Sequence, residues 1–366
     1  MNFVEKFKSG QLGKNFGLPT GLKSFDLAID GVQKKSMYGI AAAPKVGKTT
    51  FTDFSFVIHP ILYCLENNIN IEFHYFSYEI DRIRKEFDFA SFFFHYDHSI
   101  SSFEYNGNRY AIGSRYFLGR LKCKETDEII PVSKEHKLLL EKVYRTRIIP
   151  IFGEYSPEGK KIKDGIINFL ADRDNPTGMR NLLLSYYKDN GNFIYEDYFV
   201  LQNGKKVKQQ KISGYKQKDE SKYHIVITDH IRKLKRERGF SMKENIDKWI
   251  EYTVDLRNWC GSTFVHICHL NRAVGDINRI RYESETLHPT GDDVKDTGNL
   301  SEECDYLITL FNPTEERYKL DSHFGNDLSL FPNYRSIHLV ESRDTECPQH
   351  LFTQMTGNIK TFTEIY

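Results

Sequence analysis

Residues 42–49 of the chain read AAPKVGKT, a spacing that could hold the phosphate groups of a nucleotide. A glycine turn that opens a helix aims backbone N–H groups at the β-phosphate. Lys48 would then reach the β- and γ-phosphate oxygens, and the Thr49 hydroxyl would coordinate Mg²⁺. The predicted nucleotide-binding residues of this segment are Ala42, Ala43, Pro44, Lys45, Val46, Gly47, Lys48, Thr49 and Thr50. The pattern is a Walker A loop with alanine in place of the first glycine, and the alternative is a basic turn that binds no ligand.

Two carboxylates follow other apolar runs of the chain. The run HIVITDH places Asp229 at the carboxyl end of a predicted strand, where a Walker B aspartate would hold Mg²⁺. The run FHYFSYE ends in Glu79, which could polarise the water molecule that attacks a phosphate. Each has a plainer interpretation, because Asp229 could cap the next turn and Glu79 could complement the dipole of a following helix.

The elements that would position these residues alternate between strands and helices. Short apolar runs with β-branched residues predict strands at 36–41, 70–79, 147–152, 223–230, 263–270, 305–311 and 335–342. Helical spacing of apolar residues follows the glycine turn, where Pro60 should kink the helix, and recurs after residue 79 and at 242–259. This alternation indicates an α/β fold with a mostly parallel sheet that helices cover on both faces.

Two segments interrupt the alternation. Residues 95–146 are polar, aromatic and rich in short turns, and residues 186–222 hold two Asn-Gly pairs between alternating apolar residues. Because Asn-Gly favours tight hairpin turns, the second segment predicts a β-hairpin with its turn at Asn203 and Gly204. Its lysines form a candidate basic patch, for which a solvated hairpin tip is the plainer interpretation.

Composition excludes several classes of protein but does not indicate which ligand the chain binds. The 366 residues hold 51 Lys and Arg against 50 Asp and Glu, so nucleic acid would need a local basic patch or a pore lining. The six cysteines include no C-x-x-C pair, which indicates reduced thiols rather than a disulfide frame or a zinc site. No signal-peptide pattern and no run of about 18 apolar residues occurs, so the sequence predicts a soluble cytoplasmic protein without a membrane partner.

Six blocks of the sequence occur in the order found in the ATPase domain of DnaB-type replicative helicases, which are RecA-like hexameric ring motors. The blocks are GLPTGLKSFDLAIDGV, AAPKVGKTT, FSYEID, IVITDH, HICHLNR and PTGDDVKDTGNLSEECDYLI. They are spread along nearly the whole chain, which therefore resembles this family. The resemblance implies a RecA-like P-loop NTPase core and ATP hydrolysis coupled to movement along single-stranded DNA.

The resemblance gives the candidate catalytic residues their roles. Lys48 and Thr49 match the phosphate and magnesium contacts, Glu79 matches the catalytic glutamate, and Asp229 matches the Walker B acid. His269 stands where the bacterial family has a glutamine that senses the γ-phosphate, and phage ring helicases of the same superfamily place a histidine there. A buried strand histidine with a satisfied hydrogen bond is the plainer interpretation of His269.

The resemblance also predicts a DNA contact. The block DDVKDTGN matches the DNA-gripping loop, with Lys295, Asp296 and Gly298 at the positions that hold the backbone of the strand. A lysine and main-chain N–H groups suit phosphates and read no sequence, although an ordinary solvated loop is the alternative. Further positive charge near a pore would come from Arg272, Arg279 and Arg281.

Arg343 follows the last predicted strand, at the position of the arginine finger with which this family reaches the nucleotide of a neighbouring subunit. Two positions earlier the family has a basic residue, and this chain has Glu341. The resemblance therefore implies that Arg343 acts on another subunit, with this one departure from the family pattern.

The expected organisation is an N-terminal arm, 1–16, and a RecA-like ATPase domain, 17–366, with insertions at about 95–146 and 186–222. The helical domain that precedes this ATPase domain in the family, and helps to close the ring and recruit primase, has no counterpart before residue 17. We expect ATP and Mg²⁺ as ligands, single-stranded DNA as partner, a hexameric ring, and a loader or primase as a further partner. For a phage protein the compartment would be the host cytoplasm.

Two other functions stay open at this point. A RecA-type ATPase could bind DNA without unwinding it and serve recombination, loading or regulation. A third class of protein would bind a nucleotide only for structure, which the presence of Lys48, Thr49, Glu79 and Asp229 disfavours.

Overall fold

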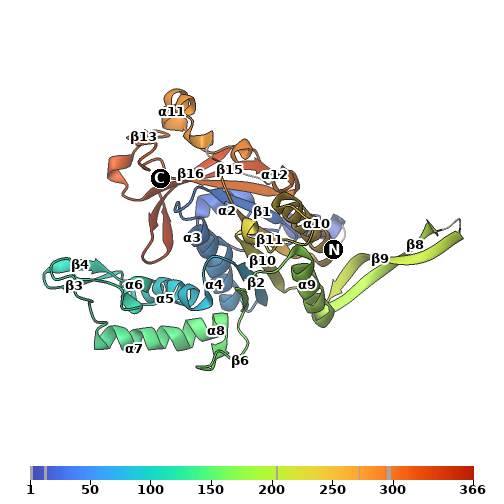
Figure 1. The fold of residues 1–366 in the computed structure, drawn as a ribbon, viewed down its shortest axis with the longest axis horizontal. Coiled ribbons are helices and arrows are strands. Elements are labelled where there is room, and N and C mark those ends of the chain that lie inside the picture. Colours follow the sequence, from blue (N-terminus) through green and yellow to red (C-terminus); the bar gives the residue numbers. More distant parts are fainter. Residues whose placement is uncertain (1–2, 12–14, 203–204, 272, 295–297) are drawn as a thin grey trace.

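A computed structural model describes residues 3–11, 15–202, 205–271, 273–294 and 298–366 of the chain. Within these residues the largest sheet has nine strands, in the order β17-β16-β15-β12-β1-β11-β10-β2-β7. Figure 1 shows this sheet with helices packed around it and a long hairpin that projects from the body. The arrangement confirms the predicted α/β fold class with a β-hairpin insertion.

The sheet is mostly parallel. Its strands are β1 (Met37–Ala42), β2 (Ile71–Ser77), β7 (Ile167–Leu170), β10 (Tyr223–Asp229), β11 (Thr263–His269), β12 (Tyr306–Phe311), β15 (Tyr334–Ser342), β16 (Gln349–Thr356) and β17 (Thr361–Glu364). The strands from β12 to β7 in the sheet order are parallel, whereas β15, β16 and β17 each run antiparallel to the preceding strand. Parallel strands need cover on both faces, and β1 is buried along its whole length.

Helices cover the two faces in separate groups. Their bounds are α1 (Phe3–Gln11), α2 (Lys23–Ile29), α3 (Lys48–Thr52), α4 (His59–Glu66), α5 (Arg82–His98), α6 (Ser114–Phe117), α7 (Lys134–Val143), α8 (Ile149–Phe152), α9 (Pro176–Asn190), α10 (Met242–Cys260), α11 (Ile277–Glu283) and α12 (Gly298–Glu303). Helices α2 to α5 and α8 bury apolar side chains against one face, and α9, α10 and α12 against the other. Along β1, Tyr38 and Ile40 join the first core and Met37 and Ala41 the second, as the alternation of a strand requires.

The predicted strand at 147–152 is wrong. A π-helical segment, Tyr144–Ile148, and α8 continue helix α7 through these residues. Ile148, Ile151 and Phe152 recur at helical spacing and are buried against the sheet. A short apolar run does not by itself distinguish a buried strand from a buried helix, and the strand of this region is β7 instead.

The helix after the glycine turn is irregular before Pro60. Helix α3 passes through a π-helical segment, Asp53–Ile58, into α4, and Pro60 lies in the first turn of α4. The three segments follow one another without a break, so Pro60 lies inside a continuous helix, beside a π-helical segment of the kind at which helices become irregular.

The predicted hairpin is present as β8 (Gly191–Gln202) and β9 (Lys205–Gln217), which pair from Gly191 and Gln217 to Gln202 and Lys205. Its predicted turn, Asn203 and Gly204, lies outside the described residues. Smaller ribbons are β3 (Ser102–Tyr105) with β4 (Asn108–Ala111), β5 (Glu154–Tyr155) with β6 (Lys161–Lys163), and β13 (Ser322–His323) with β14 (Asn326–Asp327). No helix in the described ranges combines the length and the apolar character needed to cross a bilayer.

Candidate functional site

The carboxyl ends of the parallel strands meet at one edge of the sheet. The register pairs Ala42 of β1 with His269 of β11, and Ser77 of β2 with Asp229 of β10. Segments that are far apart in the sequence therefore converge beside the glycine turn that follows β1. This edge is where open α/β sheets bind their ligands.

The phosphate loop, residues 42–49, has the backbone that its glycine predicts. Gly47 has a φ of 114°, in the left-handed region that side chains disfavour. A Cβ atom added there would also meet the Met355 sulfur atom at 2.6 Å. The backbone conformation thus requires glycine before Lys48, which begins helix α3 with a buried side chain, whereas the flexible Met355 side chain could move aside.

Lys48 contacts a histidine rather than a carboxylate. Its Nζ atom lies 3.2 Å from Nδ1 of His269. Burial lowers the pKa of Lys48, while Asp229 and Glu79 act in the opposite direction. Burial also lowers the pKa of His269, and the charge of Lys48 adds to this effect. A neutral His269 can accept a hydrogen bond from Lys48 at Nδ1 when its own proton is on Nε2.

Only one of the two carboxylate oxygens of Asp229 accepts a hydrogen bond from the residues that the structure describes. The Thr49 hydroxyl donates to Oδ2 at 3.1 Å, whereas Oδ1 is buried without a hydrogen-bond partner in the described part of the chain. Burial raises the pKa of Asp229 to about 6. Carboxylate and hydroxyl oxygens are ligands that suit Mg²⁺, so Thr49 and Asp229 fit the predicted metal site.

Glu79 lies two residues beyond the end of β2 and is exposed. The backbone holds it near the site, because Tyr78 N–H donates to the carbonyl oxygen of Asp229 at 2.7 Å. Its charge acts on Lys48, Asp229 and His269 alike. The structure thus brings Glu79 to the same edge as the phosphate loop.

Two residues of this site were missed by the sequence analysis. The ring of His230 lies 4.0 Å from that of His269, and burial, then His269, lower the pKa of His230 to about 2. Its place directly after Asp229 was a usable signal. Arg335 of β15 donates from Nε to the Val46 carbonyl at 2.8 Å, and no local pattern could link two residues 289 positions apart.

The predicted DNA contacts are only partly described. Lys295, Asp296 and Arg272 lie outside the described residues, and Gly298 begins helix α12. The segment before them is anchored next to His269, because Leu270 and Val294 form an antiparallel bridge.

The same segment is braced by Arg279. This guanidinium forms ion pairs with Asp293 at 2.7 Å and Glu283 at 3.0 Å. Two carboxylates thus neutralise the charge of Arg279, which reduces the positive charge that this residue was expected to add near a pore.

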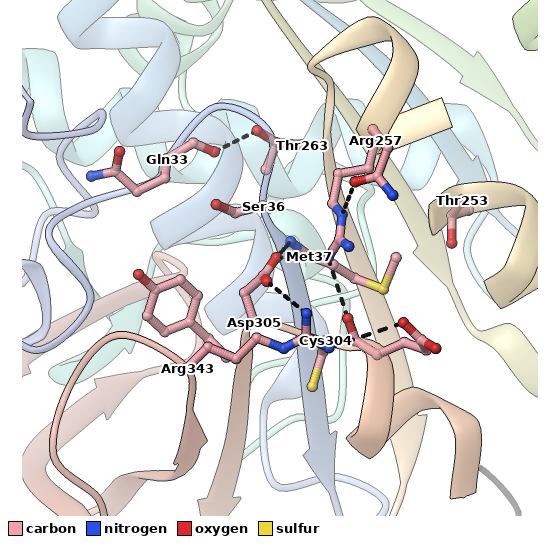
Figure 2. Close-up of polar contacts among 12 residues, drawn as sticks. Gln33, Ser36, Met37, Thr253, Arg257, Thr263, Cys304, Asp305 and Arg343 are labelled. Atoms are coloured by element: carbon pink, nitrogen blue, oxygen red, sulfur yellow. Dashed lines mark hydrogen bonds and ion pairs between the residues drawn. The ribbon is translucent and has the colours of Figure 1, made fainter. Parts of the chain in front are cut away.

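Arg343 lies beside Asp305 and Met37, at the amino end of β1 (Figure 2), whereas the phosphate loop follows the carboxyl end of that strand. Its Nη2 atom donates to the Glu302 carbonyl at 2.7 Å, and Nη1 lies 3.7 Å from Oδ1 of Asp305. Oδ2 of Asp305 accepts from Met37 N–H at 2.8 Å and from Arg257 at 2.9 Å. Because β1 runs about 20 Å from Met37 to the loop, Arg343 does not reach the phosphate loop of its own chain.

Comparisons with known proteins agree with this geometry at the level of the fold. No protein-family model matches the sequence, and no curated protein does. Among solved structures, the chain is similar to one described as an ATPase domain, with a TM-score of 0.64 and 12% identity, over 99% of this chain and 97% of that one. The chain has a RecA-like fold.

A DnaB-like replicative helicase, solved for its interactions with primase, is also similar, with a TM-score of 0.62 and 12% identity. The match covers 99% of this chain and 66% of that helicase. The RecA-like core thus corresponds in fold to about two thirds of the helicase chain.

Proposed function

We propose that the chain is an ATP-dependent DNA motor of the DnaB-like type, which hydrolyses ATP and moves along single-stranded DNA. The observation that carries the proposal is the convergence of five polar side chains at one edge of a RecA-like sheet. These side chains are Lys48, Thr49, Glu79, Asp229 and His269. Their types are those that phosphoryl transfer needs, namely a cation, two metal ligands, a base and a γ-phosphate contact.

The proposed roles follow from the contacts. Lys48 binds the β- and γ-phosphates, and Thr49 and Asp229 hold Mg²⁺, which would neutralise charge on the phosphates. Glu79 orients the attacking water from its exposed position beside the loop. A γ-phosphate would replace His269 as the partner of Lys48, and His269 would then contact the phosphate itself.

Coupling to DNA is proposed through the strand that carries His269. The next residue, Leu270, is bridged to Val294, and residues 295–298 follow directly in the chain. A displacement of His269 by the γ-phosphate would therefore reach Lys295, Asp296 and Gly298 through one backbone bridge. Arg272 would add a phosphate contact beside them.

A hexameric ring completes the proposal. The Arg343 side chain is 47% exposed and faces away from its own loop, so its nucleotide partner would belong to a neighbouring subunit. Asp305, held by Met37 N–H and Arg257, would orient it. A primase or loader is the expected further partner, in the cytoplasm of a cell or of a phage host.

The test measures ATP hydrolysis with and without single-stranded DNA, followed by strand displacement on a forked duplex. We expect DNA to stimulate hydrolysis and the protein to separate the fork. Stimulation without strand separation would favour a RecA-type ATPase that serves recombination, loading or regulation. A protein that binds ATP but never hydrolyses it would contradict both functions.

A further inference from the structure

Arg335 reaches the phosphate loop from a different part of the fold. It belongs to β15, one of the antiparallel strands, and only 7% of the residue is exposed. Its Nε atom donates to the Val46 carbonyl at 2.8 Å, and Nη1 donates to the carbonyl of its neighbour Tyr334 at 2.6 Å. The Thr353 hydroxyl donates to the Arg335 carbonyl at 2.9 Å, so both backbone and side chain are fixed.

This buried cation lacks an acidic partner. In the described ranges, no carboxylate forms an ion pair with Arg335, and Glu315, which acts on it from farther away, is paired with Arg317 at 2.8 Å. Burial accordingly lowers the pKa of Arg335. An unpaired buried charge costs stability, so its presence beside a phosphate loop suggests that the missing anion comes from a ligand.

The hydrogen bond to Val46 has a directional consequence. In a trans peptide the C=O and N–H groups point in opposite directions, so a donor behind the Val46 carbonyl orients the Gly47 N–H toward the other side. Gly47 is the N-cap residue of helix α3, and N–H groups at a helix N-terminus are the ones that point at a bound anion. A charged donor also polarises the peptide and makes its N–H a stronger donor.

We propose that Arg335 is a positioning residue of the phosphate loop, which fixes the Val46–Gly47 peptide for the phosphates of a nucleoside triphosphate bound by the same chain. The inference rests on the proposed nucleotide site and extends it by one residue. Strand β15 would then hold a functional arginine near each of its ends. Arg343 follows its last residue, about 25 Å from Arg335 along the strand. Arg335 positions the phosphate loop of its own chain, whereas Arg343 acts on the nucleotide bound by a neighbouring subunit.

The first experiment compares Arg335→Met and Arg335→Gln with the wild-type protein. We expect Arg335→Met to bind ATP at least about tenfold more weakly, while its melting temperature without nucleotide stays the same or rises, because an unpaired buried charge is removed. Arg335→Gln, which keeps a donor without the charge, should fall between the two. Arg147→Met, which removes a partly buried arginine that is paired with Asp97 far from the loop, is the control and should bind ATP normally.

A purely structural arginine would give the opposite pattern, a lower melting temperature with unchanged ATP affinity, and that result would overturn the inference. Wild-type protein that binds no ATP would instead contradict the proposed function. The two failures are therefore distinguishable in one titration series.

Mixtures of variants give a second test, which does not depend on how well one variant binds. Arg335→Met mixed with Arg343→Ala should recover ATPase activity, because some interfaces pair an intact loop with an intact Arg343. Arg335→Met mixed with Lys48→Ala should recover none, since both changes damage the loop of their own chain. Recovery in the second mixture would show that Arg335 acts on a neighbour and would refute the inference.

Discussion

At the scale of single residues, the candidate site holds opposite charges that form no ion pair with each other in the described part of the chain. Lys48 and Asp229 are both buried, yet Lys48 contacts the neutral His269 and Asp229 contacts the Thr49 hydroxyl. Burial lowers the pKa of Lys48 and raises that of Asp229, so each charge is held at a cost. A phosphate that contacts the lysine and a Mg²⁺ ion that binds the aspartate would remove this cost. The burial of the two charges is therefore a physical reason to expect ligand binding here.

Replacing Lys48 and Glu79 in turn should separate binding from chemistry. We expect Lys48→Ala to weaken ATP binding and nearly abolish turnover, because it removes the phosphate cation. Glu79→Gln should keep ATP bound while hydrolysis falls at least about a hundredfold, because only water activation is lost. Equilibrium binding and steady-state hydrolysis measure the two effects, and normal turnover in Glu79→Gln would exclude its catalytic role.

We expect the ionised carboxylate of Asp229 to lower the stability of the ligand-free protein, because it is buried as a ligand for a metal ion. Its pKa of about 6 in the folded chain lies above the ordinary value of 3.8, so the folded state takes up a proton first as the pH falls. The cost of the ionised carboxylate is therefore present above about pH 6 and disappears toward pH 4. Asp229→Asn should raise the free energy of unfolding of the ligand-free protein by up to about 3 kcal/mol at pH 8, and by about half as much at pH 5.

Denaturant unfolding of wild type and Asp229→Asn at the two pH values checks this, with stabilisation by Mg·ATP as the companion measurement. The variant should gain nothing from added Mg²⁺. A variant that is less stable than wild type at pH 8 would contradict the conclusion that burial of the ionised carboxylate costs stability.

At the scale of elements, strand β11 connects the site to the predicted DNA loop. It ends in His269, and the following Leu270 is bridged to Val294. Arg279 fixes the same segment through Asp293, next to the bridged Val294. The hairpin of β8 and β9 is the other candidate element for nucleic acid.

Lys295→Ala tests the loop. A lysine that contacts a phosphate should contribute uniformly to all sequences, so the variant should bind single-stranded DNA more weakly and lower the salt dependence by about one ion. Affinity measured across a salt series on two unrelated sequences gives both quantities. An unchanged slope would remove Lys295 from the DNA contact.

Deletion of residues 198–212 tests the hairpin. Lys208 and Lys211 are paired with Asp197 and Glu196 across its two strands, which reduces the positive charge it can offer a phosphate. We therefore expect the shortened chain to keep both its ATPase activity and its affinity for single-stranded DNA. Loss of DNA binding with intact hydrolysis would instead assign the DNA contact to the hairpin lysines.

At the scale of the whole molecule, the proposed catalytic groups lie at opposite ends of the parallel strands of one sheet. The phosphate loop follows the carboxyl end of β1, and Arg343 lies near its amino end, beside Asp305 (Figure 2). A single chain therefore cannot close its own site with this arginine. Subunits arranged head to tail can, because each would offer Arg343 to the loop of the next.

Arg343→Ala should bind ATP but be nearly inactive, since an arginine finger typically contributes about 10³ to 10⁵ in rate. ATPase activity per subunit of the wild type should also rise with protein concentration as the assembly forms. Mixing Arg343→Ala with Lys48→Ala should restore activity, because some interfaces combine an intact Lys48 with an intact Arg343. Dilute monomer that hydrolyses ATP at the full rate, or exchanged mixtures without recovery, would exclude action on a neighbour.

Much of the fold was readable in short windows of the sequence. The strands β1, β2, β10, β11, β12 and β15 and the helices α5 and α10 each follow from local periodicity, and the parallel sheet follows from their alternation. The loop at Gly47 and the carboxylates Glu79 and Asp229 were found for the same reason, because each directly follows a recognisable strand. The order of parallel strands then brings their carboxyl ends together without any further information.

The features that the sequence analysis missed depend on long-range packing. Residues 147–152 are helical because the preceding helix continues and buries Ile151 and Phe152, and the short segment RIIPIF does not by itself indicate this choice. The contact of Arg335 with Val46 joins residues 289 positions apart, and the pairing of Arg279 with Asp293 depends on how two loops meet. The sequence by itself determined which residues could bind a phosphate and where strands would hold them, because those properties are local. Only the tertiary structure decided which charges face each other, because burial and distance are set by the whole fold.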